Sequence, residues 1–148
     1  MKNKVCTFFG HRDCPDSVKP QLRKMLVELI ETQEVDTFYV GSQGKFDSLV
    51  LSVLEELSQK YPHIRYEVVL AYFPVSRKES LLPNFPHTLL PEGIEKVPPR
   101  AAISWRNQWM LRQADVVVTY VNHNWGGAAQ FAALARKQGK MVRPLGKI

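Results

Sequence analysis

The fold of this chain is indicated first by the stretch Asp115-Val-Val-Val-Thr-Tyr-Val-Asn-His-Asn-Trp-Gly-Gly-Ala-Ala-Gln130. The apolar run Val116–Val121 is typical of a strand that is buried on both faces in a parallel sheet. A loop follows at 122–125, and the Gly126-Gly127 pair opens an alanine-rich helix that runs to about Lys137. Such a glycine pair lets backbone N–H groups face outward at the positive end of a helix dipole. The stretch therefore predicts an anion site, most often one for phosphate.

The rest of the chain repeats this order of strand, loop and helix. Strands are expected at 5–9, 37–40, 66–72 and 141–144, and helices at 16–33, from about 47 to 61 and at 100–113. Asp16 or Ser17 is expected to cap the first helix. This alternation indicates right-handed crossovers and a mainly parallel sheet with helices on both faces. We therefore expect a single α/β domain over residues 1–148, a Rossmann-like three-layer fold.

One segment breaks the alternation, a Pro-rich irregular insert at about 73–100 with six of the ten prolines. A loop of this length in a compact domain is usually functional or mobile, so a lid, a dimer contact and a disordered segment are all compatible with it. Trp105 and Trp109 follow closely on the next helix. Together with the insert they suggest a face for a homo-oligomer.

Composition restricts the class of protein. The 148 residues are 45% hydrophobic and 23% charged, which is typical of a soluble domain, and no apolar run is long enough to span a membrane. The start Met1–Val5 leads directly into a strand without a signal peptide, so we expect a cytoplasmic location.

The formal charge of +6 favours anionic partners such as nucleotides, phosphorylated small molecules or nucleic acid. The histidines and cysteines lack ligand spacing, so no metal and no cofactor are expected, and Cys14 is expected to be an ordinary reduced thiol.

The loops that begin at Gly10 and Gly41 also follow strands, so we expect them to lie at the same edge of the sheet as the Gly126-Gly127 turn. Arg12, Arg100 and Arg106 are predicted to bind the anion, because a guanidinium can hold a phosphate group with two parallel hydrogen bonds. The predicted ligand-binding residues are Gly10, His11, Arg12, Gly41, Gly44, Phe46, Asp47, Arg100, Arg106, Asn107, Trp125, Gly126, Gly127 and Ala128.

Each of these residues also has a purely structural interpretation. The glycines could serve close packing or an ordinary turn, and the arginines could be solvated surface charges. Asp47 could accept a ribose hydroxyl hydrogen bond or cap a helix. His11 could act as a general acid or base, or orient its loop. Trp125 could stack on a nucleobase or close the pocket by packing.

Four motifs in this order resemble the SLOG superfamily of Rossmann-like proteins, and most closely its YpsA-like branch. The motifs are Gly10-His11-Arg12, the turn from Gly41 to Asp47, Arg106-Asn107-Gln108-Trp109-Met110 and Gly126-Gly127-Ala128. The superfamily includes the DNA-processing protein DprA and the LOG or "lysine decarboxylase"-annotated enzymes. The resemblance implies a pocket for a nucleotide or a nucleotide-derived ligand, and it does not imply one activity.

LOG enzymes cleave the N-glycosidic bond of cytokinin nucleotides with a Pro-Gly-Gly-x-Gly-Thr-x-x-Glu motif. In this chain Trp125 replaces the proline, Ala129 the third glycine, Gln130 the threonine and Ala133 the glutamate. The catalytic carboxylate of those enzymes is thus absent at its usual position, and Asp47 and His11 are the remaining catalytic candidates.

The sequence therefore favours a nucleotide-binding sensor or accessory module. A nucleotide N-glycosidic bond hydrolase is the first alternative, and a DprA-like single-stranded nucleic-acid binder is the second. Whether the chain is an enzyme is left open by the sequence.

Overall fold

The protein folds around a six-stranded parallel sheet with the strand order β4-β3-β2-β1-β5-β6. A computed structural model describes residues 4–42, 44–71 and 87–145. The strands are β1 (Lys4–Gly10), β2 (Val35–Val40), β3 (Arg65–Val69), β4 (Thr88–Leu89), β5 (Val116–Tyr120) and β6 (Met141–Pro144).

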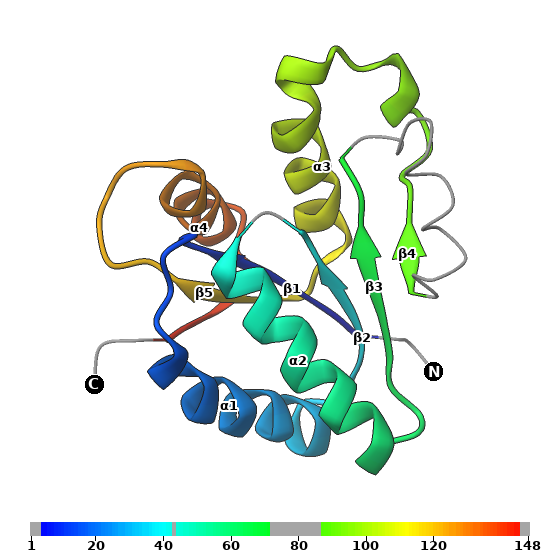
Figure 1. Ribbon diagram of the computed structural model, residues 1–148, viewed down its shortest axis with the longest axis vertical. Helices are drawn as coiled ribbons and strands as arrows, with labels where there is room; N and C mark the ends of the chain where they lie inside the picture. The colour runs from blue at the N-terminus through cyan, green and yellow to red at the C-terminus, as the bar shows by residue number, and fades with distance from the viewer. Residues whose placement is uncertain (1–3, 43, 72–86, 146–148) are drawn as a thin grey trace.

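Helices cover both faces of this sheet, which makes three layers. They are α1 (Lys19–Thr32), α2 (Lys45–Lys60), α3 (Pro99–Gln113) and α4 (Gly127–Lys137). Figure 1 shows α1 and α2 on one face of the sheet and α3 and α4 on the other. The prediction of a single α/β domain with a Rossmann-like fold and a mainly parallel sheet is confirmed.

The central strands are buried on both faces, and alternate residues divide between two hydrophobic cores. Phe8 of β1 and Val118 of β5 belong to the core under α1 and α2. Phe9 and Val117 belong to the core under α3 and α4, where the Phe9 ring stacks on Phe131 with centroids 5.2 Å apart. All five residues of β5 are buried, as its uninterrupted apolar run predicts.

The start of α1 differs from the prediction. A short 3-10 helix, η1 (Asp16–Val18), precedes α1, and the N-cap residue of α1 is Val18, with no side-chain capping bond. The prediction that Asp16 or Ser17 caps this helix is therefore wrong. A proline in the first turn of α1 takes part in its initiation, because its fixed φ suits a helix start and it has no N–H that needs a partner there.

The segment expected to be irregular contains regular structure where it is described. Residues 72–86 lie outside the described residues, so this prediction is followed only from His87 onward. There β4 pairs with β3, and a 3-10 helix, η3 (Ile94–Lys96), leads to α3. A two-residue strand is too short to produce a periodic sequence pattern. The preceding strand also ends at Val69, three residues before its predicted end.

The strand order reverses between β1 and β5, which are neighbours in the sheet. Connections from the two strands therefore lead to helices on opposite faces, and a crevice forms between them at the carboxyl ends. The loop after β1 and the loop after β5 flank this crevice. A hydrogen bond from the His11 backbone N–H to the Tyr120 carbonyl, 3.1 Å long, joins the two loops.

Candidate functional site

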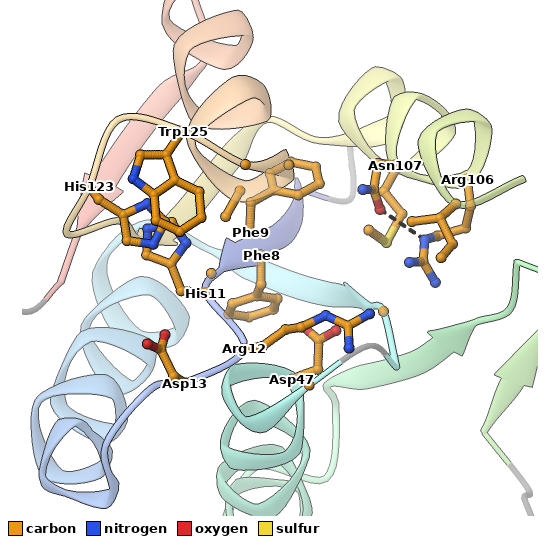
Figure 2. A pocket seen from close by; sticks show the side chains of 18 residues that line it. Phe8, Phe9, His11, Arg12, Asp13, Asp47, Arg106, Asn107, His123 and Trp125 are labelled. Carbon is orange, nitrogen blue, oxygen red and sulfur yellow. Dashed lines mark hydrogen bonds between the residues drawn. The ribbon is translucent and has the colours of Figure 1, made fainter. Parts of the chain in front are cut away.

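A cavity of about 490 Å³ lies in this crevice, at the carboxyl ends of β1, β2 and β5. Its size falls within the range of small-molecule sites in proteins. Figure 2 shows the side chains that line it, contributed by the loops after these strands and by the first turns of α2 and α4 and the middle of α3.

Twelve of the fourteen residues predicted to bind a ligand line this cavity. The twelve are Gly10, His11, Arg12, Gly41, Gly44, Asp47, Arg106, Asn107, Trp125, Gly126, Gly127 and Ala128. Both candidates for catalysis, Asp47 and His11, are among them. Residues from four separate stretches of sequence thus meet at one place, as the topology requires.

The structure does not bring the other two predicted residues to the cavity. Phe46 is only 1% exposed and packs in the core against Phe8, with ring centroids 6.5 Å apart. Arg100 is exposed in the first turn of α3 and is not among the lining residues. Phe46 acts instead as a support, since its ring lies directly under Gly10.

Six lining residues were not predicted. They are Phe8, Phe9, Asp13, Ile103, Met110 and His123. Ile103 and Met110 lie three residues before and four residues after Arg106, so helical spacing would have placed them on the same face of α3. His123 lies three residues before Gly126, but its contact with His11 joins two loops and has no signal in the sequence.

The glycines after β1 and β2 lie in tightly packed surroundings. A Cβ atom on Gly10 would lie 2.2 Å from the Phe46 ring, and one on Gly44 would lie 2.9 Å from the Cα atom of Arg12. A Cβ atom on Gly41 would lie 3.1 Å from Asp47 Oδ2 and 3.2 Å from Arg106 Cζ. These three glycines therefore allow protein groups to approach one another closely.

The glycines after β5 are in a different situation. Gly126 has a φ of 94°, in the left-handed region that favours glycine, and it is the N-cap of α4. Gly127 is the first residue of α4, and apart from its chain neighbours and the backbone of its own helix no heavy atom lies within 4 Å of the position of a Cβ atom there. Neither packing nor a positive φ explains Gly127, and its backbone faces open space at the cavity.

Arg106 is held inside the protein rather than presented to solvent. The residue is 1% exposed, its Nη1 donates to the Val69 carbonyl at 2.8 Å, and its Nε donates to Asn107 Oδ1 at 2.9 Å. Its guanidinium also lies beside Gly41, as does the Asp47 carboxylate. Arg106 therefore connects α3 to the ends of β2 and β3, and it forms one wall of the cavity.

Arg12 is the arginine of this cavity whose side chain is exposed. Its backbone is fixed, because its carbonyl accepts a hydrogen bond of 3.0 Å from the Lys45 N–H at the start of α2. The anchored backbone holds the β1 loop against α2 and leaves the guanidinium at the cavity. Arg12 is thus the better placed of the two lining arginines to meet an incoming anion.

Three aromatic rings form a continuous stack along one wall of the cavity. The His11 and His123 ring centroids are 3.5 Å apart with planes at 17°, and those of His123 and Trp125 are 3.8 Å apart at 19°. Figure 2 shows the three rings in order, on the side of the view away from Arg106 and Asn107. Trp125 forms the outer end of the stack and is 68% exposed.

The two imidazoles of this stack have unusual surroundings. His11 is 6% exposed, and among the described residues neither His11 Nε2 nor His123 Nδ1 has a hydrogen-bond partner, although both atoms are buried. Burial lowers the pKa of His11 below its usual value, and His123 lowers it further, while Asp13 acts in the opposite direction. His11 is therefore neutral at pH 7.

Cys14 behaves as a structural thiol. Burial is the main cause that raises its pKa to about 11, and Asp13 adds to the effect. At neutral pH it is a protonated thiol and a poor nucleophile, as expected from the sequence.

The two tryptophans proposed for an oligomer face have contacts within the chain. Trp109 packs on Tyr39 with ring centroids 5.3 Å apart, and the Trp105 ring lies next to Gly93. Within the described ranges, no helix is long and apolar enough to cross a membrane, and no group of three or more metal-ligating side chains occurs.

Comparison with known proteins gives fold relatives only. No protein-family model matches the chain, and no curated protein matches it. Two similar solved structures are DNA processing protein A (DprA) from Streptococcus pneumoniae, with a TM-score of 0.70, and DprA from Helicobacter pylori, with a TM-score of 0.67. The Helicobacter protein was solved for its unique single-stranded DNA binding mode.

The likeness to DprA covers this chain almost completely but covers the DprA chains in part. It spans 99% of this chain and 51% of the Streptococcus protein at 15% identity, and 98% of this chain and 66% of the Helicobacter protein at 16% identity. The chain thus corresponds to about half to two-thirds of the length of these structures. At such identities the likeness establishes the fold alone, which is Rossmann-like.

Proposed function

We propose that this chain binds a nucleotide or a nucleotide-derived ligand in the cavity at the carboxyl ends of β1, β2 and β5. The proposed role is that of a sensor or accessory module of the SLOG type, in its YpsA-like branch. The observation that carries the proposal is the open space in front of Gly127, a residue that lines the cavity at the N-terminus of α4.

The phosphate end of the ligand is assigned to the turn between β5 and α4. The first N–H groups of a helix have no partner within that helix, and the helix dipole adds partial positive charge there. Gly127 has no side chain to block an approach to these groups. Arg12, exposed on the same cavity, supplies a full positive charge.

The base end of the ligand is assigned to Trp125. One face of this indole is covered by His123, while the residue as a whole is 68% exposed. An indole that is already held by a stacked neighbour loses little freedom when a base stacks on its free face. Asp47 and Asn107, on the far side of the cavity, are suited to sugar hydroxyls or to polar edges of the base.

The second candidate function is binding of single-stranded nucleic acid. Two observations favour it. The two similar structures named above are DprA proteins, and an exposed tryptophan on the same cavity as an exposed arginine is suited to base stacking and backbone binding. The net charge of +6 is compatible with it. This candidate uses the same residues, so the two functions differ in the length of the ligand.

The test is a binding screen by thermal shift and calorimetry with nucleoside monophosphates, sugar phosphates and an oligothymidylate. Arg12→Ala is compared with Arg112→Ala, which removes an exposed arginine at the end of α3, outside the cavity lining. We expect a monophosphate to stabilise the protein, and we expect Arg12→Ala alone to weaken the effect. The same incubations, analysed for released base, test the hydrolase alternative.

The outcomes separate the candidates. Tight binding of the oligonucleotide with a steep salt dependence, and none of monophosphates, would favour the nucleic-acid function. Binding that is equally affected by Arg112→Ala would place the ligand elsewhere. No binding of any compound in the panel would contradict both functions.

A further inference from the structure

The His11–His123 stack is unusual because two titratable rings face each other at a centroid distance of 3.5 Å. Two imidazolium ions at this separation would repel strongly, so the stack accommodates at most one added proton. It also lies against the start of α4, since the position of a Cβ atom on Gly126 is 4.0 Å from His123 Cε1. The stack and the anion site proposed above are therefore neighbours.

Each imidazole has a buried nitrogen without a hydrogen-bond partner among the described residues, His11 Nε2 and His123 Nδ1. Buried polar atoms are normally paired, and an exception in a cavity wall indicates a group that completes its bonding when a ligand is present. A neutral imidazole nitrogen becomes a donor when it takes up a proton, and a donor is what an anion requires.

We propose that the stacked pair His11–His123 takes up one proton when an anionic ligand binds at the N-terminus of α4. This inference rests on the proposed function, because it concerns the same site. It names the regulation of that site: ligand affinity follows pH in the range in which histidine titrates.

The charges around the pair explain why the proton arrives with the ligand. In the free protein, burial and the positive end of the α4 dipole disfavour an imidazolium, while Asp13 and a backbone hydrogen bond between His11 and His123 favour it. From β5, the uncharged Tyr120 ring packs edge-on against His11. Farther along the cavity wall lie the oppositely charged Asp47 and Arg106. A bound anion reverses the balance at the helix start.

The position of Trp125 makes the two rings of the pair unequal. An indole ring attracts a cation placed over its face, and His123 lies 3.8 Å from Trp125. His11 is more deeply buried and carries the lowered pKa. A positive charge in the stack is therefore best accommodated beside the indole of Trp125.

The direction of the pH effect follows from linkage. Ligand binding raises the pKa of the pair, so binding takes up a proton and affinity increases as pH falls. For one proton the increase is up to roughly tenfold per pH unit between the pKa values of the bound and free states. The affinity stops increasing at pH values at which the histidine pair is already protonated in the free protein.

The probe must keep its own charge constant, because a phosphate monoester titrates near pH 6. We choose the 5′-sulfates of thymidine and adenosine and measure their dissociation constants at pH 8, 7 and 6. Calorimetry at pH 7 in two buffers of different ionisation enthalpy counts the protons directly. The variants are His123→Gln and, as a matched control, His63→Gln, which removes an exposed histidine outside the cavity lining.

We expect the wild type and His63→Gln to bind more tightly by severalfold per pH unit as pH falls, and His123→Gln to lose this slope while it remains folded in a thermal melt. If His123→Gln does not fold, the number of protons taken up by the wild type on binding, measured by calorimetry in the two buffers, tests the inference without the variant. Binding without proton uptake, or a slope retained in His123→Gln, would overturn the inference and leave the proposed function intact. Binding of phosphate esters but not of sulfate esters would also overturn it. No binding of either class at any pH would overturn both.

Discussion

The loops after β1 and β2 and the loop after β5 all carry glycine between a strand and a helix, yet the surroundings of these glycines differ. Gly10, Gly41 and Gly44 are approached by side chains or backbone of the protein itself, at 2.2 to 3.1 Å from the position of a Cβ atom. Gly127 faces nothing within 4 Å. A glycine between a strand and a helix therefore marks either a tight internal contact or an open approach, and only the neighbours distinguish the two.

The comparison teaches how the site is built. The loops after β1 and β2 form a packed side of the cavity, called the frame below. Its geometry is fixed by close contacts, which are Phe46 with Gly10, Arg106 and Asp47 with Gly41, and the Arg12 backbone with Gly44. The open turn after β5 is the side that is left for a ligand. The two sides should respond to mutation in opposite ways.

The largest effect is expected in the frame, for Gly10→Ala. The added methyl group would overlap the Phe46 ring, which lies in the core and has little room to move. We expect the free energy of unfolding to fall by about 3 kcal/mol or more, the upper end for overpacked cores. Chemical denaturation measures it. A loss below about 1 kcal/mol would show that Phe46 shifts easily and would weaken the division into frame and open turn.

A smaller loss of stability is expected for Arg106→Met. The substitution keeps most of the side-chain volume but leaves the buried Val69 carbonyl without its 2.8 Å donor. We expect a loss of about 1–3 kcal/mol, the cost of an unsatisfied buried polar group. Arg112→Met, at an exposed position in the same helix, serves as the control and should change stability little. Equal effects of the two variants would show that Arg106 has no structural role.

On the open side, Trp125→Ala is expected to leave the free energy of unfolding nearly unchanged and to reduce the affinity for the ligand. The side chain is largely exposed, so the fold loses little, while a stacked base would lose about 1–3 kcal/mol of binding free energy. Met141→Ala removes the other large exposed apolar side chain of the described residues, on β6, and should leave affinity unchanged. Unchanged affinity in Trp125→Ala would exclude the stacking role.

A small change in stability is expected for Gly127→Ala, and its sign is opposite to that expected for Gly10→Ala and Arg106→Met. Alanine has room at this helical position and is a better helix former, so stability should rise by about 0.5–1 kcal/mol. Ligand affinity should fall, because the methyl group enters the open space. Thermal unfolding with and without ligand measures both. A loss of stability without ligand would mean that Gly127, too, is a packing glycine.

Much of this arrangement could be predicted from the sequence because it follows from local patterns and topology. The buried run of β5 and the apolar face of α1 have clear periodicity, and parallel strands bring their carboxyl ends together without further information. Twelve lining residues were found in this way.

The rest could not be predicted, because it depends on contacts between distant segments. Nothing local shows that Phe46 turns into the core under Gly10 or that Arg106 is buried by Val69. The stack of His11 on His123 joins residues from two loops that meet only in the folded chain. The two-residue strand β4 depends on its partner β3 and leaves no pattern of its own.

The most direct test of the account is a two-dimensional NMR titration of the labelled protein with the best nucleotide from the binding screen. If the ligand occupies the open side, the backbone amides of Gly127 and Ala128 and the indole N–H of Trp125 should shift most, and they should saturate together. Little change is expected at Ser52 or His87, which lie at a separate, shallower hollow beside β3 and β4. Saturating shifts confined to that second region, with Gly127 and Trp125 unmoved, would contradict the assignment of the ligand to the turn between β5 and α4.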